Sequence, residues 1–105
     1  MSKYNLETLW ENRYGTKTEV YDYAGRKMLK SAIGNVNSSY QPTIDHIRPI
    51  SKGGEDVKEN IAICNVTTNR EKGDTFSTWS TNGKTFQAKR TKGNRKGYKI
   101  YQIND

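Results

Sequence analysis

A short stretch in the middle of the chain restricts its fold more than any other feature. The segment 41–50 contains three isoleucines among polar residues and is predicted to be extended. The glycine pair at 53–54 opens a polar loop, and the Ile-Ala-Ile run at 61–63 predicts a short buried strand. Residues 65–72 then predict a helix of two turns that ends at Gly73. This order of strand, loop, strand and short helix is typical of a small α+β domain.

The residues before this stretch predict one helix and a pair of short strands. Apolar side chains follow helical spacing over residues 4–14, at Leu6, Leu9, Trp10 and Tyr14. Residues 19–23 predict a strand, and Ala24-Gly25 predicts a turn into residues 26–29. Residues 30–39 are rich in Ser, Asn and Gly and are predicted to be irregular.

The residues after the central stretch predict paired strands. Asn82-Gly83 is a strong hairpin signal between strands expected near 75–80 and 85–90. A last strand is predicted over 97–103, where Tyr98 and Ile100 share one face. The C-terminal third is therefore expected to form a hairpin or a small sheet.

The chain is long enough for one domain, residues 1–105, with a small core. Its 105 residues include only 17 Leu, Ile, Val and Phe, but seven Tyr and two Trp add apolar area. No apolar run approaches the ~20 residues of a membrane span, and we expect a cytoplasmic protein with no signal peptide and no membrane partner. One cysteine and one histidine exclude a disulfide framework and a His-rich metal site. Cys64 is expected to be a small buried residue.

Positive charge is concentrated at the C-terminal end. Residues 1–74 have a net charge of +1, whereas residues 75–105 have a net charge of +6. Such a block is typical of a protein that binds a polyanion, with nucleic acid as the first candidate. A solvated basic tail is the simpler alternative, but the aromatic residues within the block favour a folded basic surface.

A histidine beside an acid is the main chemical signal of the central stretch. His46, the single histidine, follows Asp45, and Asn60 and Asn69 stand downstream of the glycine pair at 53–54. A lone histidine is more often structural than catalytic, and a neighbouring acid alone changes this little. The pattern becomes informative because all of these elements occur together.

This pattern resembles the HNH endonuclease family, whose active site is built on a ββα-metal hairpin and helix. It is most similar to the subset with Asn in the third motif position, such as the HNH domains of CRISPR effector nucleases and of phage and intron-encoded nicking enzymes. The core motif covers residues 41–74, and residues 21–26 match more loosely. The expected fold is an α+β domain with this core, an N-terminal helix and a basic C-terminal hairpin or sheet at 75–105.

The resemblance implies a role for each motif residue. Asp45 and Asn69 would ligate one metal ion, and His46 would be the general base that activates water. Asn60 would tie the loop to the strand and help to orient His46. Asn65 shares a helix face with Asn69 and stays an alternative for the third position.

The chemistry of phosphodiester hydrolysis agrees with these roles. A neutral imidazole can take a proton from water near pH 7. A carboxylate and an amide carbonyl are hard oxygen ligands that suit Mg²⁺ or Mn²⁺. Because neighbouring strand residues point to opposite faces, the strand is expected to end, twist or bulge where Asp45 and His46 meet the site. No paired cysteines are present, so we expect no structural zinc.

Several basic residues are candidates for DNA contact. Three lie in the core motif, where Lys72 either contacts a phosphate or simply favours the helix C-terminus. Seven lie in the C-terminal block. The predicted DNA-binding residues are Arg48, Arg70, Lys72, Lys84, Lys89, Arg90, Lys92, Arg95, Lys96 and Lys99. Tyr21, Tyr23 and Arg26 either pack in the core or line the substrate groove.

The resulting hypothesis is a divalent-metal-dependent HNH endonuclease that nicks DNA, with RNA as a second substrate left open. No motif for base readout is visible, so weak sequence preference is expected. The molecule would be a monomer or a homodimer, from a phage, a mobile element or a restriction-like system. Two alternatives stay open, namely a non-catalytic basic DNA-binding module and the nuclease domain of a bacterial toxin.

Overall fold

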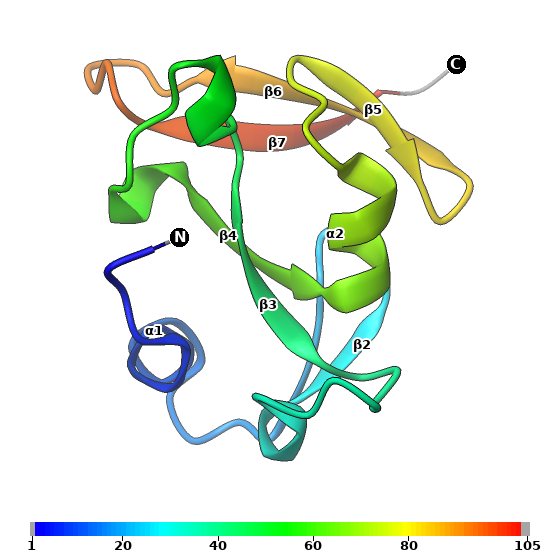
Figure 1. Ribbon diagram of the computed structural model, residues 1–105. Coiled ribbons are helices and arrows are strands. Elements are labelled where there is room, and N and C mark those ends of the chain that lie inside the picture. Colours follow the sequence, from blue (N-terminus) through cyan, green and yellow to red (C-terminus); the bar gives the residue numbers. More distant parts are fainter. Residues whose placement is uncertain (1, 104–105) are drawn as a thin grey trace.

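The computed structural model describes residues 2–103, and within them the chain forms two α-helices and seven strands (Figure 1). In chain order these are α1 (Leu6–Tyr14), β1 (Glu19–Tyr21), β2 (Lys27–Leu29), β3 (Pro42–His46), β4 (Ile61–Asn65), α2 (Val66–Lys72), β5 (Thr78–Thr81), β6 (Lys84–Arg90) and β7 (Tyr98–Ile103). The strands make three antiparallel sheets, β1-β2, β3-β4 and β5-β6-β7. The predicted α+β class is confirmed. Of the predicted domain 1–105, residues 1 and 104–105 lie outside the described residues.

The β3-β4 hairpin and α2 form one continuous unit at the centre of the molecule. β3 pairs with β4 from Pro42 opposite Asn65 to His46 opposite Ile61. Asn65 ends β4 and also caps α2, because its side chain accepts a hydrogen bond from the Thr67 N–H at 2.8 Å. The helix therefore begins directly after the strand, one residue later than the sequence predicted.

The loop between β3 and β4 turns back over the residues that follow His46. The Gly54 N–H donates to the Pro49 carbonyl at 2.9 Å, and a Cβ built on Gly54 would lie 1.8 Å from the Arg48 carbonyl oxygen. No side chain fits at that distance, so this position requires glycine. The extended segment predicted over 41–50 accordingly ends as a strand at His46, and the chain leaves the sheet there.

Two hydrophobic clusters flank the central unit. One packs α1 and β2 against β4 through buried side chains of Leu9, Trp10, Met28, Ile61 and Ile63. The other packs the C-terminal sheet against the chain after β1 and β3, and its buried members are Ala24, Ile47, Trp79, Phe86, Ala88 and Tyr98. Aromatic side chains supply much of this second core, as expected for a chain with few aliphatic residues.

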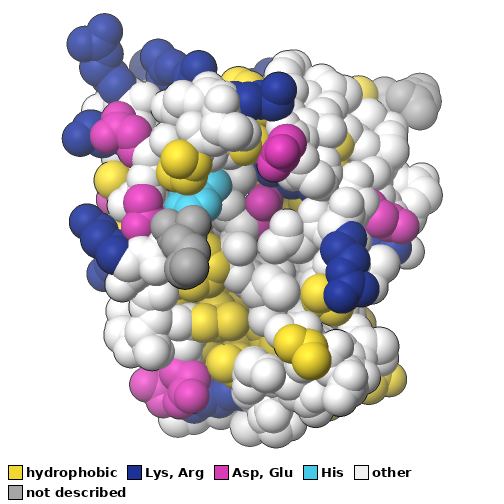
Figure 2. All heavy atoms as spheres, in the orientation of Figure 1, with side chains coloured by type: hydrophobic (Ala, Val, Ile, Leu, Met, Phe, Trp, Pro, Cys, Tyr) yellow, Lys and Arg dark blue, Asp and Glu magenta, His cyan; other side chains and the backbone are white. Residues whose placement is uncertain are grey.

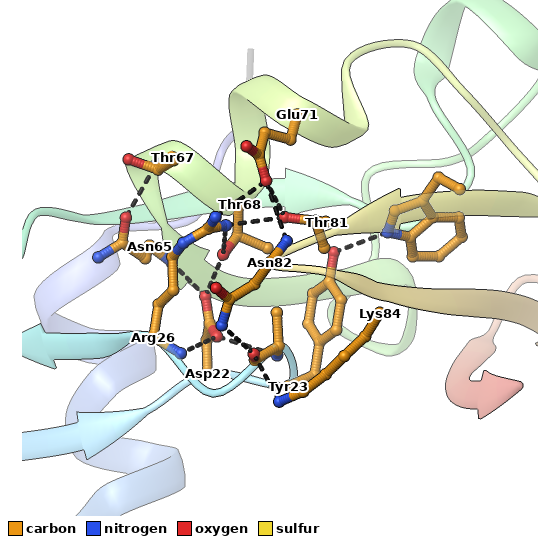
Figure 3. Close-up of polar contacts among 12 residues, drawn as sticks. Asp22, Tyr23, Arg26, Asn65, Thr67, Thr68, Glu71, Thr81, Asn82 and Lys84 are labelled. Carbon is orange, nitrogen blue, oxygen red and sulfur yellow. Dashed lines mark hydrogen bonds and ion pairs between the residues drawn. The ribbon is translucent and has the colours of Figure 1, made fainter. Parts of the chain in front are cut away.

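A buried polar network joins three parts of the fold (Figure 3). The Asp22 carboxylate accepts hydrogen bonds from the backbone N–H groups of Ala24, Arg26 and Asn65 and from the Thr68 hydroxyl, at 2.7–3.0 Å. The Arg26 guanidinium in turn reaches the hydroxyl groups of Thr68 and Thr81. It also pairs with Glu71 at 2.9 Å. This network connects the β1-β2 turn to α2 and to the β5-β6 hairpin.

The C-terminal residues form a twisted sheet of three strands rather than a flexible tail. Asn82 and Gly83 join β5 to β6 with φ angles of +52° and +73°, so both central residues lie in the left-handed region that a tight hairpin turn requires. β6 then pairs with β7 along its length. The predicted hairpin and last strand are both present. No helix within residues 2–103 is long and apolar enough to cross a membrane.

Candidate active site

A cavity of about 440 Å³ lies where the end of β3 faces α2. Asp45 and His46 line it from the strand, Asn69 and Arg70 from the helix, and Asp74 from the residues after it. Figure 2 shows the histidine side chain, in cyan, on the face toward the viewer, with Lys and Arg side chains gathered along the upper and left margins. The structure therefore brings three of the four predicted motif residues to one cavity.

The Asp45 carboxylate is nearly buried, with 8% of the residue exposed. Its Oδ2 atom has no hydrogen-bond partner, and the contact that balances its charge is an ion pair with Lys72 Nζ at 3.2 Å. Burial raises the pKa of Asp45, and the neighbouring Lys72 ammonium opposes this shift. The site thus holds a desolvated carboxylate oxygen that is not committed to a directed hydrogen bond.

Lys72 lies in the interior and not on the surface. The residue is 1% exposed, its ammonium donates to the His46 carbonyl at 3.2 Å, and it lies 5.1 Å from the centre of the Trp79 ring. A buried ammonium requires compensation of this kind, which Asp45 and the ring supply. DNA contact by Lys72 stays a prediction, and its observed role is to balance Asp45.

The His46 imidazole contacts an acid that the sequence did not single out. Its Nε2 atom lies 2.8 Å from Asp56 Oδ1. The Asp56 carboxylate also accepts from the Lys3 backbone N–H and from the Ser2 hydroxyl, both at 2.7 Å. The hydrogen bonds from Lys3, His46 and Ser2 hold the pKa of Asp56 well below its usual range.

The three asparagines occupy different environments. Asn60 is fully buried; its Oδ1 accepts from the Arg48 N–H at 2.9 Å, and its Nδ2 donates to the Arg48 and Glu55 carbonyls. It therefore holds the loop after His46 and does not line the cavity. Asn65 caps α2 and donates to two backbone carbonyls, so its side chain is used within the fold. Asn69 alone faces the cavity.

Asp45 and Asn69 fit a hard divalent cation by their chemistry. The Asn69 amide nitrogen donates to the Thr43 hydroxyl at 3.0 Å and to the Ile44 carbonyl at 3.4 Å. This orientation leaves the amide oxygen for a ligand, and the Asp45 carboxylate, whose Oδ2 atom has no hydrogen-bond partner, lines the same cavity. No group of three or more His, Cys, Asp or Glu side chains that could hold a metal occurs within residues 2–103. Asp45 and Asn69 would supply two oxygens to such an ion, and water and substrate would complete its coordination.

The predicted DNA-binding residues differ in how far their side chains are exposed to solvent. Arg48 is half-buried, donates to the Lys52 carbonyl and the Tyr98 hydroxyl, and stacks over Phe76 at 5.2 Å. Lys84 is half-buried and donates to the Ala24 carbonyl. The exposed members are Arg70, Lys89, Arg90, Lys92, Arg95, Lys96 and Lys99. Of these, Arg70 lines the cavity.

Asp56 is the residue near the site that the sequence did not indicate. It lies ten positions after His46 in a polar loop, and no spacing distinguishes it from its neighbours Glu55 and Glu59. Tyr23 packs against Phe86 and accepts a hydrogen bond from the Trp79 ring, so packing is its observed role.

Comparison with protein-family models matches residues 29–75 to HNH endonuclease. Neither the search of curated proteins nor the search of solved structures gave a match. The matched residues contain β3, β4 and α2, and thus every residue of the cavity that the motif predicted. The family generally uses a divalent metal ion and acts on nucleic acid. The segment 29–75 of this chain therefore belongs to the HNH endonuclease family.

Proposed function

We propose that this protein is a metal-dependent endonuclease that nicks DNA with weak sequence preference. The observation that carries the proposal is the convergence of Asp45, His46 and Asn69 on one open cavity. Binding alone does not require a buried carboxylate oxygen without a hydrogen bond next in the chain to an imidazole. Hydrolysis of a phosphodiester requires both a base and a cation site.

The roles follow from the contacts. His46 takes the proton of the attacking water, and Asp45 and Asn69 would hold one Mg²⁺ or Mn²⁺ ion. When bound, the ion neutralises the phosphate and the leaving oxygen. Lys72 balances the Asp45 charge when the metal is absent. Arg70, which is exposed and lines the cavity, would contact a phosphate next to the scissile one.

The C-terminal sheet supplies the DNA-holding surface in this proposal. Lys89 and Lys99 lie directly opposite each other on β6 and β7, and both are exposed. Like charges in that position repel, and a bound phosphate would relieve the repulsion. Lys96, in the loop between these strands, lies 3.5 Å from Glu55, so this basic loop adjoins the loop that carries Asp56. The basic surface thus reaches toward the cavity.

Plasmid nicking tests the chemistry. Wild type with Mg²⁺ or Mn²⁺ is expected to convert supercoiled plasmid to open circle, and EDTA is expected to stop it. His46→Ala removes the base and is expected to lower the rate about 10²- to 10⁴-fold. Asn37→Ala, at an exposed position that does not line the cavity, is the matched control and is expected to keep full activity. Equal rates for His46→Ala and wild type would refute the assignment.

Salt dependence tests the DNA surface. If about five of the basic residues of the C-terminal block neutralise phosphates, log affinity falls with log salt at a slope of roughly −4 to −5. Double substitution of Lys89 and Lys99 by Gln is expected to make the slope shallower by about 2. Salt-sensitive binding without any cleavage would favour a DNA-binding module over an enzyme.

A further inference from the structure

We propose that Asp56 is a positioning residue for His46, and that residues 2–4 hold it in place. Asp56 fixes the imidazole in the tautomer with the proton on Nε2, which leaves Nδ1 to accept the proton of water. This inference rests on the proposed function for the role of the base. The contacts that support it are independent of metal and DNA.

The first step is the geometry of the imidazole. Nε2 lies 2.8 Å from Asp56 Oδ1, and among the residues that the structure describes none hydrogen-bonds Nδ1. A carboxylate only accepts, so in the neutral ring the proton must be on Nε2. The lone pair is then on Nδ1 of a half-buried side chain that lines the cavity. A base of this kind is ready without any rearrangement of its proton.

The second step is the anchoring of Asp56 itself. The Lys3 backbone N–H donates to Oδ2 and the Ser2 hydroxyl donates to Oδ1. The Ser2 oxygen also accepts from the Tyr4 N–H at 3.1 Å, which directs its proton toward Asp56. Figure 1 shows the N-terminal segment running beside the loop that leads into β4. The carboxylate that contacts His46 is therefore also held by two residues that are far away in sequence.

The Asp56→Asn substitution distinguishes a positioning residue from a purely structural one, because it changes which nitrogen of His46 carries the proton. In Asp56→Asn, the amide oxygen faces the Lys3 N–H, because a backbone N–H cannot accept, whereas the Ser2 hydroxyl can turn its proton away and accept from the amide NH₂. The amide NH₂ then faces His46 Nε2 and donates to it. The ring proton must move to Nδ1, which removes the lone pair from the position of the base.

The chain has a single histidine, so its imidazole gives one set of NMR signals. ¹⁵N–¹H correlation spectra at pH 8, without metal or DNA, report which nitrogen carries the proton. We expect the Nε2–H tautomer in wild type, the Nδ1–H tautomer in Asp56→Asn, and a mixture in Asp56→Ala. Ser2→Ala weakens the anchor without changing the atom that faces His46, so the Nε2–H tautomer is expected to persist. An unchanged Nε2–H tautomer in Asp56→Asn would overturn the proposal.

Nicking kinetics provide the second readout. Asp56→Asn and Asp56→Ala are expected to lower kcat about 10- to 100-fold with little change in KM. The reason is that His46 in the wrong tautomer or orientation loses part of the rate enhancement that a general base supplies. Glu55→Gln is the matched control, since it removes one negative charge from the neighbouring position without touching His46. It should leave both tautomer and kcat unchanged. Wild-type kcat in Asp56→Asn would refute a positioning role while leaving the nuclease assignment intact. If wild type itself does not cleave, the proposed function fails, and the tautomer alone decides whether Asp56 orients His46.

Discussion

Asp22 and Asp45 are both 8% exposed, yet the fold treats their carboxylates in opposite ways. Asp22 accepts four hydrogen bonds from neutral donors and lies at the junction of three structural parts. Asp45 has one ion pair, to Lys72, and keeps an oxygen without a hydrogen bond. A fully satisfied carboxylate stabilises structure, whereas an incompletely satisfied one costs stability and is kept where a ligand completes it. The comparison separates the scaffold of this molecule from its site.

Removal of the Asp22 carboxylate, whose hydrogen bonds are all made, is expected to cause the greatest loss of stability. Asp22→Ala leaves several buried donors without an acceptor, so it should reduce the free energy of unfolding by about 3–5 kcal/mol. Urea denaturation followed by tryptophan fluorescence measures this. Glu19→Ala is the control, because Glu19 forms only an exposed pair with Lys27 at 3.7 Å and should cost less than about 0.5 kcal/mol. A loss below about 1 kcal/mol for Asp22→Ala would contradict the role of the network.

Removal of the Asp45 charge is expected to cause the next greatest loss of stability. Asp45→Asn leaves the buried Lys72 ammonium without its counter-charge and is expected to cost about 3 kcal/mol. Adding Lys72→Met removes the stranded charge, so the double variant should return to within about 1 kcal/mol of wild type while cleavage stays absent. The urea midpoints of the two single variants and the double variant give the coupling. Additive losses would show that Asp45 and Lys72 do not form an isolated pair.

The least change in stability is expected from Glu71, which lies at the exposed edge of the Asp22 network, and it should depend on pH. Hydrogen bonds from the Thr81 hydroxyl, the Asn82 N–H and Arg26 lower the pKa of Glu71 to about 2. A carboxylate whose pKa is lowered by folding stabilises the folded state at pH values above its pKa in the unfolded chain, near 4.5. This stabilisation is lost as the pH falls toward 2. The difference in urea midpoint between wild type and Glu71→Gln should therefore be largest at pH 6 and mostly gone at pH 2. A difference that does not change over this range would argue against the Glu71 contacts.

The order of elements was predictable because local rules control it. The Asn82-Gly83 turn, the Gly73 stop and the short buried strand at 61–63 each depend on residues close in sequence. The spacing of Asp45-His46, Asn60 and Asn69 identified the family segment for the same reason. The choice between Asn65 and Asn69 could not be made from spacing, since the helix predicted over 65–72 placed both on one face. Only the observed cap showed that Asn65 is used within the fold.

The α+β class, the HNH segment and the position of the positive charge could all be predicted from the sequence, because they follow from local pattern and composition. The tertiary structure alone decided which polar groups meet. Asp56 reaches His46 because the loop closes over Gly54, and Ser2 and Lys3 reach Asp56 across more than fifty positions of sequence. Lys72 is buried because the C-terminal sheet places Trp79 against α2. Contacts between distant residues depend on how the packed elements fit, which no local spacing encodes.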